Sequence, residues 1–183
     1  MKLHNTKLNG VAVLELSPIS DERGTFTRIL CRRELEEFGV TSEFVQCNQS
    51  ICNARGTLRG LHYQTPPHAE AKLVHCVKGR IFDVAVDIRK GSATFLDWVG
   101  IELSSGDNQS IYVGPGFAHG YMALTDCAEV IYHSSAYYTP ENEARVRFDD
   151  ARVGIVWPIE IPILSPKDSA TDRLSEDFTG VVF

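Results

Sequence analysis

The histidines, lysine and tyrosines of a few short segments are the residues of this sequence best suited to move protons. Residues 56–64, GTLRGLHYQ, place Arg59 between two glycines and His62 two residues after the second glycine. Histidine is the most frequent general base near neutral pH, because its ordinary pKa of about 6.5 lets small environmental effects prepare it for proton transfer. A structural histidine in a turn is the competing interpretation, and this segment alone does not separate the two.

Two further segments carry a lysine and a second histidine. Lys72 opens the apolar run AKLVH, where an isolated lysine is usually a solvated side chain at the end of a strand. Residues 114–121, GPGFAHGY, read as a glycine-rich turn that presents His119 between small residues. Because the spacing does not match GxGxxG and no βαβ unit surrounds it, a dinucleotide site is disfavoured.

The remaining candidates lie toward the C-terminus. Tyr132, Ser134, Ala136 and Tyr138 alternate along one predicted strand and therefore share a face. On such a face a tyrosine is either a packed aromatic or, where it lines a cavity, a proton donor. Asp168 of LSPKD is a carboxylate that can orient a histidine far away in sequence.

These side chains must be positioned by a chain made almost entirely of strand and turn patterns. A few short helices are expected beside the strands; the only convincing one near the start of the chain is residues 32–38, which Gly39 ends, and Lys78-Gly79-Arg80 is short enough to be a hairpin turn. Seven or more short strands predict an all-β sandwich or barrel, and we favour a cupin-type jelly roll. The expected strands are Val11 to Leu16, Phe44 to Ser50, Lys72 to Lys78, Arg80 to Arg89, Trp98 to Leu103, Ser110 to Val113 and Ala128 to Tyr138.

The strand predicted over residues 80–89 has the clearest alternation. Four apolar residues at positions 82, 84, 86 and 88 share one face, and Asp83 and Asp87 lie on the other. One face of this strand is therefore expected to be polar.

A metal site of the kind common in cupins would have to be assembled from His62, His68, Glu70 and His119. The sequence has no HxH pair, and Pro66-Pro67 interrupts the segment between the first two histidines. We therefore expect no metal and no cofactor.

Length and charge limit the possible partners. The 183 residues fit a single domain spanning 1–183, and the 18 Lys and Arg against 24 Asp and Glu give a net charge of −6. No basic run is present to neutralise a line of phosphates, so nucleic acid is not an expected partner, whereas a small anionic ligand remains compatible. No apolar stretch approaches the roughly 20 residues of a membrane span, so we expect no membrane association and a cytoplasmic protein.

Five segments occur in an order and spacing that resemble the dTDP-4-dehydrorhamnose 3,5-epimerases. They are GTLRGLHYQ, AKLVHCVKGRIFDVAVDIRKGSATFLDWVGIELS, GPGFAHGYMALTD, YxxxAYYTPENE and LSPKD, and the resemblance extends from Asp21 to Asp168. It implies a jelly-roll cupin fold, a homodimer, no metal, and a nucleotide-linked 4-keto-6-deoxy sugar as substrate.

The same resemblance implies a catalytic set. His62 would be the general base, oriented by Asp168, and Tyr132 would be the acid on the opposite face of the sugar. Lys72 would lie by the C4 oxygen, where an ammonium stabilises the enolate that forms when a proton leaves the neighbouring carbon. His119 and Asp83 resemble the family's second histidine–carboxylate pair, which lines the cavity.

For the nucleotide, the resemblance implies the residues Arg23, Phe26, Gln46, Asn48, Arg59 and Tyr138. The two arginines suit a diphosphate and Phe26 offers a stacking surface for a pyrimidine. Two positions depart from the family pattern: Arg28 replaces a usual Glu, and His133 a frequent Lys. These departures leave the proton-transfer residues unchanged and leave the base or the sugar open.

The expected activity is therefore epimerisation at C3 and C5 of dTDP-4-dehydro-6-deoxy-D-glucose. The alternatives are epimerisation at a single carbon, another nucleotide sugar such as a CDP-linked deoxyhexose, and, from a different class, a metal-dependent or ligand-binding cupin. The sequence leaves open the nucleotide, the number of carbons inverted and the pathway served.

Overall fold

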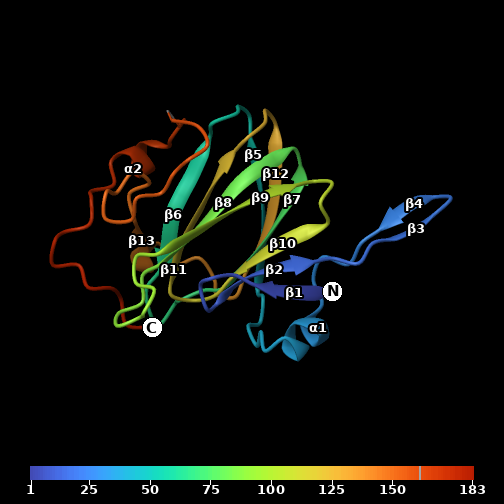
Figure 1. Ribbon diagram of the computed structural model, residues 1–183, viewed down its shortest axis with the longest axis horizontal. Coiled ribbons are helices and arrows are strands. Elements are labelled where there is room, and N and C mark those ends of the chain that lie inside the picture. The colour runs from blue at the N-terminus through green and yellow to red at the C-terminus, as the bar shows by residue number, and fades with distance from the viewer. Residues whose placement is uncertain (161) are drawn as a thin grey trace.

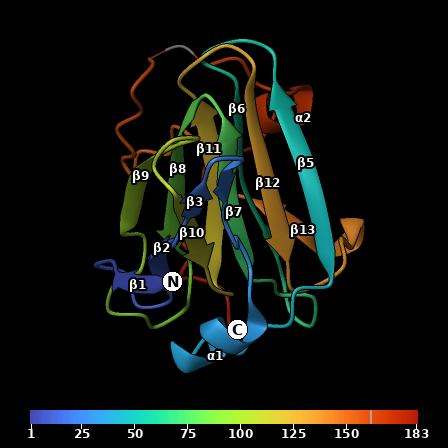
Figure 2. The same cartoon turned by 90° about the vertical axis from the view of Figure 1, so that its right-hand side faces the viewer.

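Two antiparallel β-sheets face each other in the computed structural model, which describes residues 1–160 and 162–183. The larger sheet has the order β1-β2-β10-β7-β12-β5 and the smaller one the order β13-β6-β11-β8-β9 (Figures 1 and 2). Side chains of both sheets, such as Val74 and Val130 from one and Ile81 and Tyr121 from the other, meet in a common apolar core. The prediction of an all-β sandwich is confirmed.

The strands are short and the helices few. The strands of the larger sheet are β1 (Lys2–Asn5), β2 (Val11–Glu15), β5 (Gln46–Cys52), β7 (Lys72–Lys78), β10 (Gln109–Val113) and β12 (Ala128–Ser134). The smaller sheet contains β6 (Leu58–Gln64), β8 (Arg80–Asp87), β9 (Trp98–Ser104), β11 (Phe117–Ala123) and β13 (Glu143–Arg145). Outside the sheets lie the hairpin of β3 (Ile19–Asp21) and β4 (Gly24–Phe26), the helices α1 (Arg32–Glu37) and α2 (Pro166–Ser169), and a 3₁₀ turn (Pro140–Asn142). The predicted helix near residue 32 is confirmed, and Gly39 follows it with φ +79°.

The hairpin predicted at Lys78-Gly79-Arg80 is wrong. β7 pairs with β10 and β12 in the larger sheet, whereas β8 pairs with β11 and β9 in the smaller one. The chain therefore turns a corner from one sheet to the other at Gly79, which has φ +72°. A Cβ there would lie 2.2 Å from the Thr125 hydroxyl oxygen, so the corner has room only for glycine.

The glycine-rich segment 114–121 is a turn only over its first residues, and His119 itself lies on the strand β11. All of β11 is buried, and it lies between β6 and β8 at the centre of the smaller sheet. Its Gly120 meets Gly60 of β6 so closely that a Cβ added to Gly60 would be 2.6 Å from the Gly120 Cα. These glycines serve the close approach of two strands, which is why the sequence pattern of a loop misled the prediction.

The alternation along β8 is confirmed, but both faces are buried. Val84 and Val86 pack into a second apolar cluster on the outer side of the smaller sheet, whereas Ala85 lies in the core between the sheets. Asp83 is fully buried on that inner side. The face predicted to be polar is thus the wall of the interior.

Asp87, at the end of β8, is a structural carboxylate. It accepts hydrogen bonds from the Arg89 guanidinium (2.7 Å) and from the hydroxyls of Ser92 (2.6 Å) and Thr94 (2.6 Å). Burial alone would raise its pKa, but these hydrogen bonds outweigh burial and lower the pKa to about 2. Asp87 therefore fixes the loop that follows β8 and does not face the cavity.

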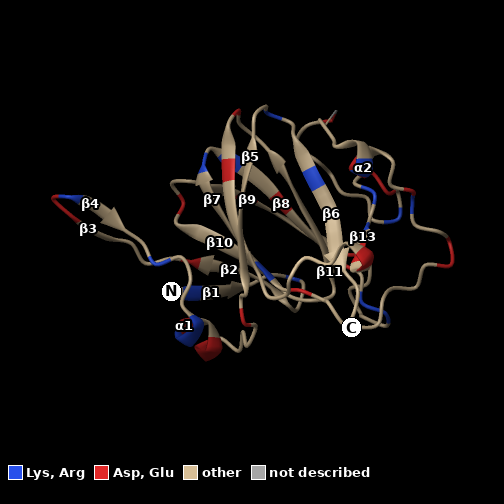
Figure 3. Ribbon diagram, turned by 180° about the vertical axis from the view of Figure 1, so that it is seen from behind, with Lys and Arg blue, Asp and Glu red and all other residues tan. Residues whose placement is uncertain are grey.

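Charge is dispersed over the molecule. Figure 3 shows Lys and Arg interspersed with Asp and Glu on the strands, the hairpin tip and α1, without a long run of one sign. Among the described helices, none is long and apolar enough to cross a membrane.

Candidate active site

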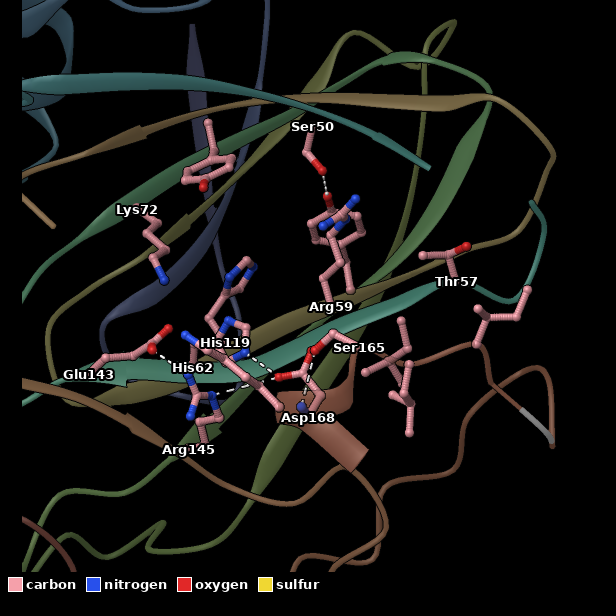
Figure 4. Close-up of a pocket in the computed structure, with 16 residues that line it drawn as sticks. Ser50, Thr57, Arg59, His62, Lys72, His119, Glu143, Arg145, Ser165 and Asp168 are labelled. Atoms are coloured by element: carbon pink, nitrogen blue, oxygen red, sulfur yellow. Dashed lines mark hydrogen bonds and ion pairs between the residues drawn. The ribbon is translucent and has the colours of Figure 1, made fainter. Parts of the chain in front are cut away.

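A cavity of about 450 Å³ opens between the two sheets, and a histidine–carboxylate pair lies on its wall. The Nε2 of His62, on β6, is 2.7 Å from Oδ1 of Asp168, on α2 (Figure 4). The His62 side chain is 31% exposed and that of Asp168 is 5% exposed. The imidazole therefore reaches the cavity while its carboxylate partner is shielded behind it.

The local sequence of LSPKD explains how Asp168 reaches this position. Ser165 is the N-cap of α2, and its hydroxyl accepts a hydrogen bond from the Asp168 backbone N–H at 3.1 Å. Pro166 occupies the first helical position, where its missing N–H has no cost. Burial would raise the pKa of the Asp168 carboxyl, but His62, Ser165 and the charge of Arg145 together hold it below its ordinary value.

A β-bulge places Arg59 and His62 on the same face of β6. Their separation of three residues would put them on opposite faces of a regular strand. The pairing of β6 with β11 shifts between His119 and Tyr121: His119 pairs with His62, and Tyr121 pairs with Arg59, so one extra residue is inserted on β6. The two glycines of RGLH and HGY allow this close, irregular contact, and both Arg59 and His62 line the cavity.

The opposite wall of the cavity belongs to the larger sheet and carries Lys72 and Tyr132. Ser134 pairs with Lys72 across β12 and β7, and Tyr132 is two residues from Ser134, so Lys72 and Tyr132 share the inward face. The Lys72 ammonium is 3.1 Å from a carboxylate oxygen of Glu70. Burial, reinforced by the charge of Glu70, raises the pKa of the Tyr132 hydroxyl, which keeps it protonated at neutral pH.

His119 and Asp83 form a second histidine–carboxylate pair. Nε2 of His119 lies 2.9 and 3.0 Å from the two carboxylate oxygens of Asp83, and both side chains are buried. His119 contributes to the cavity wall, whereas Asp83 lies behind it. This pair supports the wall beside His62.

A second cavity of about 310 Å³ adjoins the first and shares His62, Lys72, Tyr132 and Glu143 with it. Three predicted nucleotide-binding residues line this cavity: Gln46, Asn48 and Tyr138. The amide nitrogen of Asn48 is buried and has no hydrogen-bond partner among the described residues, so a donor is free there for a ligand.

Tyr138 does not lie on the strand predicted for it. β12 ends at Ser134: the Ser135 N–H still bonds to the Ala71 carbonyl, but the Ala71 N–H donates to the Ser135 hydroxyl at 2.7 Å and not to its carbonyl, so the ladder stops there. The buried Gln64 holds the following loop: its amide oxygen accepts from the Thr139 N–H at 2.6 Å and its amide nitrogen donates to the Tyr137 carbonyl at 3.2 Å. The shared face predicted for positions 132 to 138 therefore holds only as far as Ser134.

Arg23 and Phe26 lie away from this cavity, on the β3–β4 hairpin that projects from the body of the molecule (Figure 1). The Phe26 side chain is exposed, and the Arg23 guanidinium pairs with Asp21 of the same hairpin at 2.5 Å. The structure thus brings ten of the twelve predicted site residues together around the two cavities and leaves these two outside.

Several cavity residues were missed by the sequence reasoning. They are Ser50, Thr57, Tyr121, Glu143, Arg145, Ser165 and Lys167. Tyr121 donates a hydrogen bond to Ser50 at 2.7 Å next to Arg59 (Figure 4), and burial raises the pKa of its hydroxyl. Glu143 and Arg145 were hidden because the three-residue strand β13 has no recognisable pattern, whereas its pairing with β6 would have revealed them.

Among residues 1–160 and 162–183, no group of three or more His, Cys, Asp or Glu side chains is arranged to hold a metal ion. Of the residues weighed as ligands, His62 and His119 each bind a carboxylate through Nε2, and Glu70 pairs with Lys72. The fold and the site together define a jelly-roll protein of the cupin type, with a histidine–carboxylate pair facing a lysine and a tyrosine across a cavity.

Comparison with known proteins places this site in a family. The family model described as dTDP-4-dehydrorhamnose 3,5-epimerase matches residues 5–176, and the chain belongs to this enzyme family. It is 43% identical over 169 residues to the dTDP-4-dehydrorhamnose 3,5-epimerase of Shigella flexneri, which covers 92% of this chain and 93% of the relative.

Solved structures of relatives agree with the fold. A dTDP-6-deoxy-D-glucose-3,5-epimerase from Legionella pneumophila in complex with dTDP-4-keto-L-rhamnose has a TM-score of 0.89 and 40% identity, covering 94% of this chain and 92% of that one. A 3'-monoepimerase from Streptomyces bikiniensis in complex with dTDP-quinovose has a TM-score of 0.85 and 33% identity, covering 93% and 86%. The predicted cupin-type jelly roll is confirmed.

Proposed function

We propose that this enzyme epimerises dTDP-4-dehydro-6-deoxy-D-glucose at C3 and C5, giving dTDP-4-dehydro-L-rhamnose. The observation that carries the proposal is the placement of His62 on one sheet and of Tyr132 and Lys72 on the other, with the cavity between them. Inversion at a carbon requires removal of a proton from one face and its return from the opposite face. Two facing sheets provide the two faces.

The proton-transfer roles follow from the contacts of each side chain. Because Asp168 accepts the Nε2–H of His62, the neutral imidazole has its lone pair on Nδ1 and takes the carbon proton there. The electrons of the broken C–H bond move to the C4 oxygen, and the Lys72 ammonium stabilises the enolate. The protonated Tyr132 hydroxyl then donates its proton to the carbon from the other side, and the C4 carbonyl is restored.

In this proposal the nucleotide binds to the other polar side chains around the two cavities. Arg59 lines the cavity, and its guanidinium donates a 3.2 Å bond to the Ile51 carbonyl and lies near the Cys52 thiol, without a carboxylate partner among the described residues. A diphosphate oxygen suits such a guanidinium. The unpartnered amide nitrogen of Asn48 suits a carbonyl oxygen of a base, and Tyr138, which is half exposed, offers a ring for stacking.

The experiment that tests the activity is proton exchange in heavy water. The enzyme is incubated with dTDP-4-dehydro-6-deoxy-D-glucose in D₂O, and loss of the H3 and H5 signals is followed by NMR together with product stereochemistry. We expect deuterium at both carbons and the L-rhamno product. Exchange at C3 alone would identify a single-carbon epimerase, and no exchange would refute the proposal; His4→Asn, on the exposed strand β1, is a control for histidine loss outside the cavity.

We further propose a homodimer in which each chain's β3–β4 hairpin completes the partner's site. The hairpin has two strands of three residues, and its exposed residues include Ile19 (68%) and Phe26 (66%). An isolated two-stranded hairpin is marginally stable in water, so this apolar surface needs a protein surface to pack against. Arg23 at its tip would then supply a second cation for the diphosphate.

Mixing two inactive variants tests this arrangement. In a mixed dimer of Arg23→Ala and His62→Asn chains, one site combines an intact His62 with an intact Arg23 from the other chain. An equal mixture should recover about a quarter of wild-type activity, because half of the dimers are mixed and one of their two sites is intact. If both residues act in the same chain, mixing restores nothing.

A cytoplasmic location remains our prediction from the sequence.

A further inference from the structure

Among the described residues that line the cavity, Arg145 of β13 is the cation with an ion-pair contact to the carboxylate of the histidine–carboxylate pair. β13 pairs with β6, and Arg145 lies directly opposite His62, so the two side chains share a face. The Arg145 Nε is 3.8 Å from Oδ1 of Asp168, the same oxygen that contacts His62 (Figure 4). The other end of its guanidinium pairs with Glu143.

The Arg145 side chain is held in place and yet not fully partnered. It is 23% exposed, and its Nε–H is buried with no hydrogen-bond partner among the described residues. A buried donor without an acceptor is unfavourable, and Asp168 Oδ1 lies 3.8 Å from this nitrogen, within ion-pair distance but beyond a hydrogen bond. The positive charge of the guanidinium thus lies beside the carboxylate that contacts the proposed base.

The chemistry of the pair shows why such a cation matters. A carboxylate that accepts the Nε2–H of a histidine stabilises the imidazolium, and an imidazolium cannot take a proton from carbon. A second cation beside the carboxylate opposes that stabilisation, because its positive charge offsets the negative charge of the carboxylate and repels the imidazolium.

We propose that Arg145 is a positioning residue that lowers the proton affinity of the His62–Asp168 pair, so that His62 is neutral and ready to accept a proton near neutral pH. The role acts through Asp168 and requires no contact between Arg145 and the substrate. It rests on the proposed function of His62 as the base. Nothing in the family resemblance assigns a role to this position.

Other charged and titratable groups also surround the cavity near His62 and act on the protonation of the pair together with Arg145. They are Lys167 beside Asp168 on α2, Glu143 beside Arg145 on β13, Arg59 on its own strand, His119 with Asp83 on β11 and β8, Lys72 with Glu70 at β7, and the neutral hydroxyl of Tyr132 on β12. Lys72 and His119 have carboxylate partners of their own. Arg145 differs from these groups because an ion-pair contact joins it to the carboxylate of the pair.

The test is the pH dependence of three variants. Arg145→Gln removes the charge, Arg145→Lys keeps it, and Arg173→Gln removes an exposed arginine that pairs with Asp149 outside the cavity. We expect Arg145→Gln to move the acidic limb of kcat/KM upward by about one pH unit, so that activity falls about tenfold below the midpoint and little above it. Arg145→Lys should restore most of the shift, and Arg173→Gln should not move the limb.

A second readout separates this proposal from the proposed function. ¹⁵N NMR of labelled imidazoles follows the protonation of His62 in the free protein, with assignment from His62→Asn, and it needs no turnover. If the wild type does not epimerise the sugar but the His62 titration moves with Arg145→Gln, the proposed function fails and the role of Arg145 stands.

Two results would overturn the inference. One is a uniform loss of activity in Arg145→Gln with the acidic limb and the His62 titration unmoved, which is what a merely structural arginine gives. The other is an equal shift in Arg145→Lys, since that variant retains the charge. If Arg145→Gln does not fold, Glu143→Gln gives the test with the opposite sign: removing this neighbouring anion should move the His62 titration downward, and an upward or absent shift contradicts the proposal.

Discussion

Replacing Tyr132 by phenylalanine should separate proton removal from inversion. The change deletes one hydroxyl and keeps the ring. Because that hydroxyl makes no hydrogen bond to another described residue, its loss should lower the free energy of unfolding by less than about 1 kcal/mol. His62 and Asp168 lie on the other wall and are untouched. Exchange at the carbon next to the ketone should therefore continue while protonation from the opposite face is lost.

The expected size of the effect follows from the role of a general acid. Removing one typically lowers the rate by about 10²-fold or more, which corresponds to about 2.7 kcal/mol in the activation barrier. Phenylalanine has no hydroxyl to ionise, so no change in pH should recover the lost step in the variant. Inverted product should fall by this factor, with exchange within a few-fold of the wild type.

The assay measures deuterium incorporation and product stereochemistry in the same sample. Tyr137→Phe is the matched control, because Tyr137 is 68% exposed and lines neither cavity. Inversion at the native rate in Tyr132→Phe would refute the reasoning and transfer the donor role to Tyr138 or water. Loss of exchange together with inversion would show that the hydroxyl also helps to form the enolate.

Three further predictions concern the base, the metal and the stability of the fold. His62→Asn should reduce exchange at both carbons by about 10²- to 10⁴-fold with an unchanged circular dichroism spectrum, and near-normal exchange would reassign His62 to a structural role. Turnover should survive exhaustive chelation because Lys72 supplies the positive charge at the C4 oxygen; loss of activity that one divalent ion restores would contradict this. Asp87→Asn should lower the free energy of unfolding by about 2 kcal/mol at pH 7, measured by urea denaturation. Since the pKa of Asp87 is depressed to about 2 from 3.8, this contribution is present above pH 3.8 and disappears as the pH falls through about 2, so the variant should show a flatter acid dependence and an equally steep one would refute the assignment.

The sequence alone was sufficient for the fold class, since alternation and turn residues located β8, β9 and every strand of the larger sheet except β1 to within a few residues. It failed where tertiary contact decides the local structure. β6 and β11 carry glycines that usually indicate loops, yet in this fold the glycines let the two strands touch. Propensity describes one chain segment at a time and therefore cannot register such a contact.

The candidate site shows the same division between local and long-range information. The pairing of His62 with Asp168 spans 106 residues, and no spacing rule predicts it. The family resemblance supplied it, and the structure gives the physical means: a capped turn of four residues at Pro166–Ser169. Arg145 was missed for the complementary reason, because its importance comes only from lying opposite His62 on an adjacent strand.

The division of the site between two sheets has a consequence for how the enzyme tolerates change. His62 and Arg59 belong to the smaller sheet, and Lys72 and Tyr132 belong to the larger one, so the packing of the sheets sets the distance between the proposed base and the proposed acid. Sheets that pack face to face lie about 10 Å apart, which leaves room for a sugar ring where side chains do not fill the gap. Proton transfer is sensitive to displacements well below that spacing. Core substitutions between the sheets, far from any charged group, should therefore reduce inversion more than they reduce binding of the nucleotide.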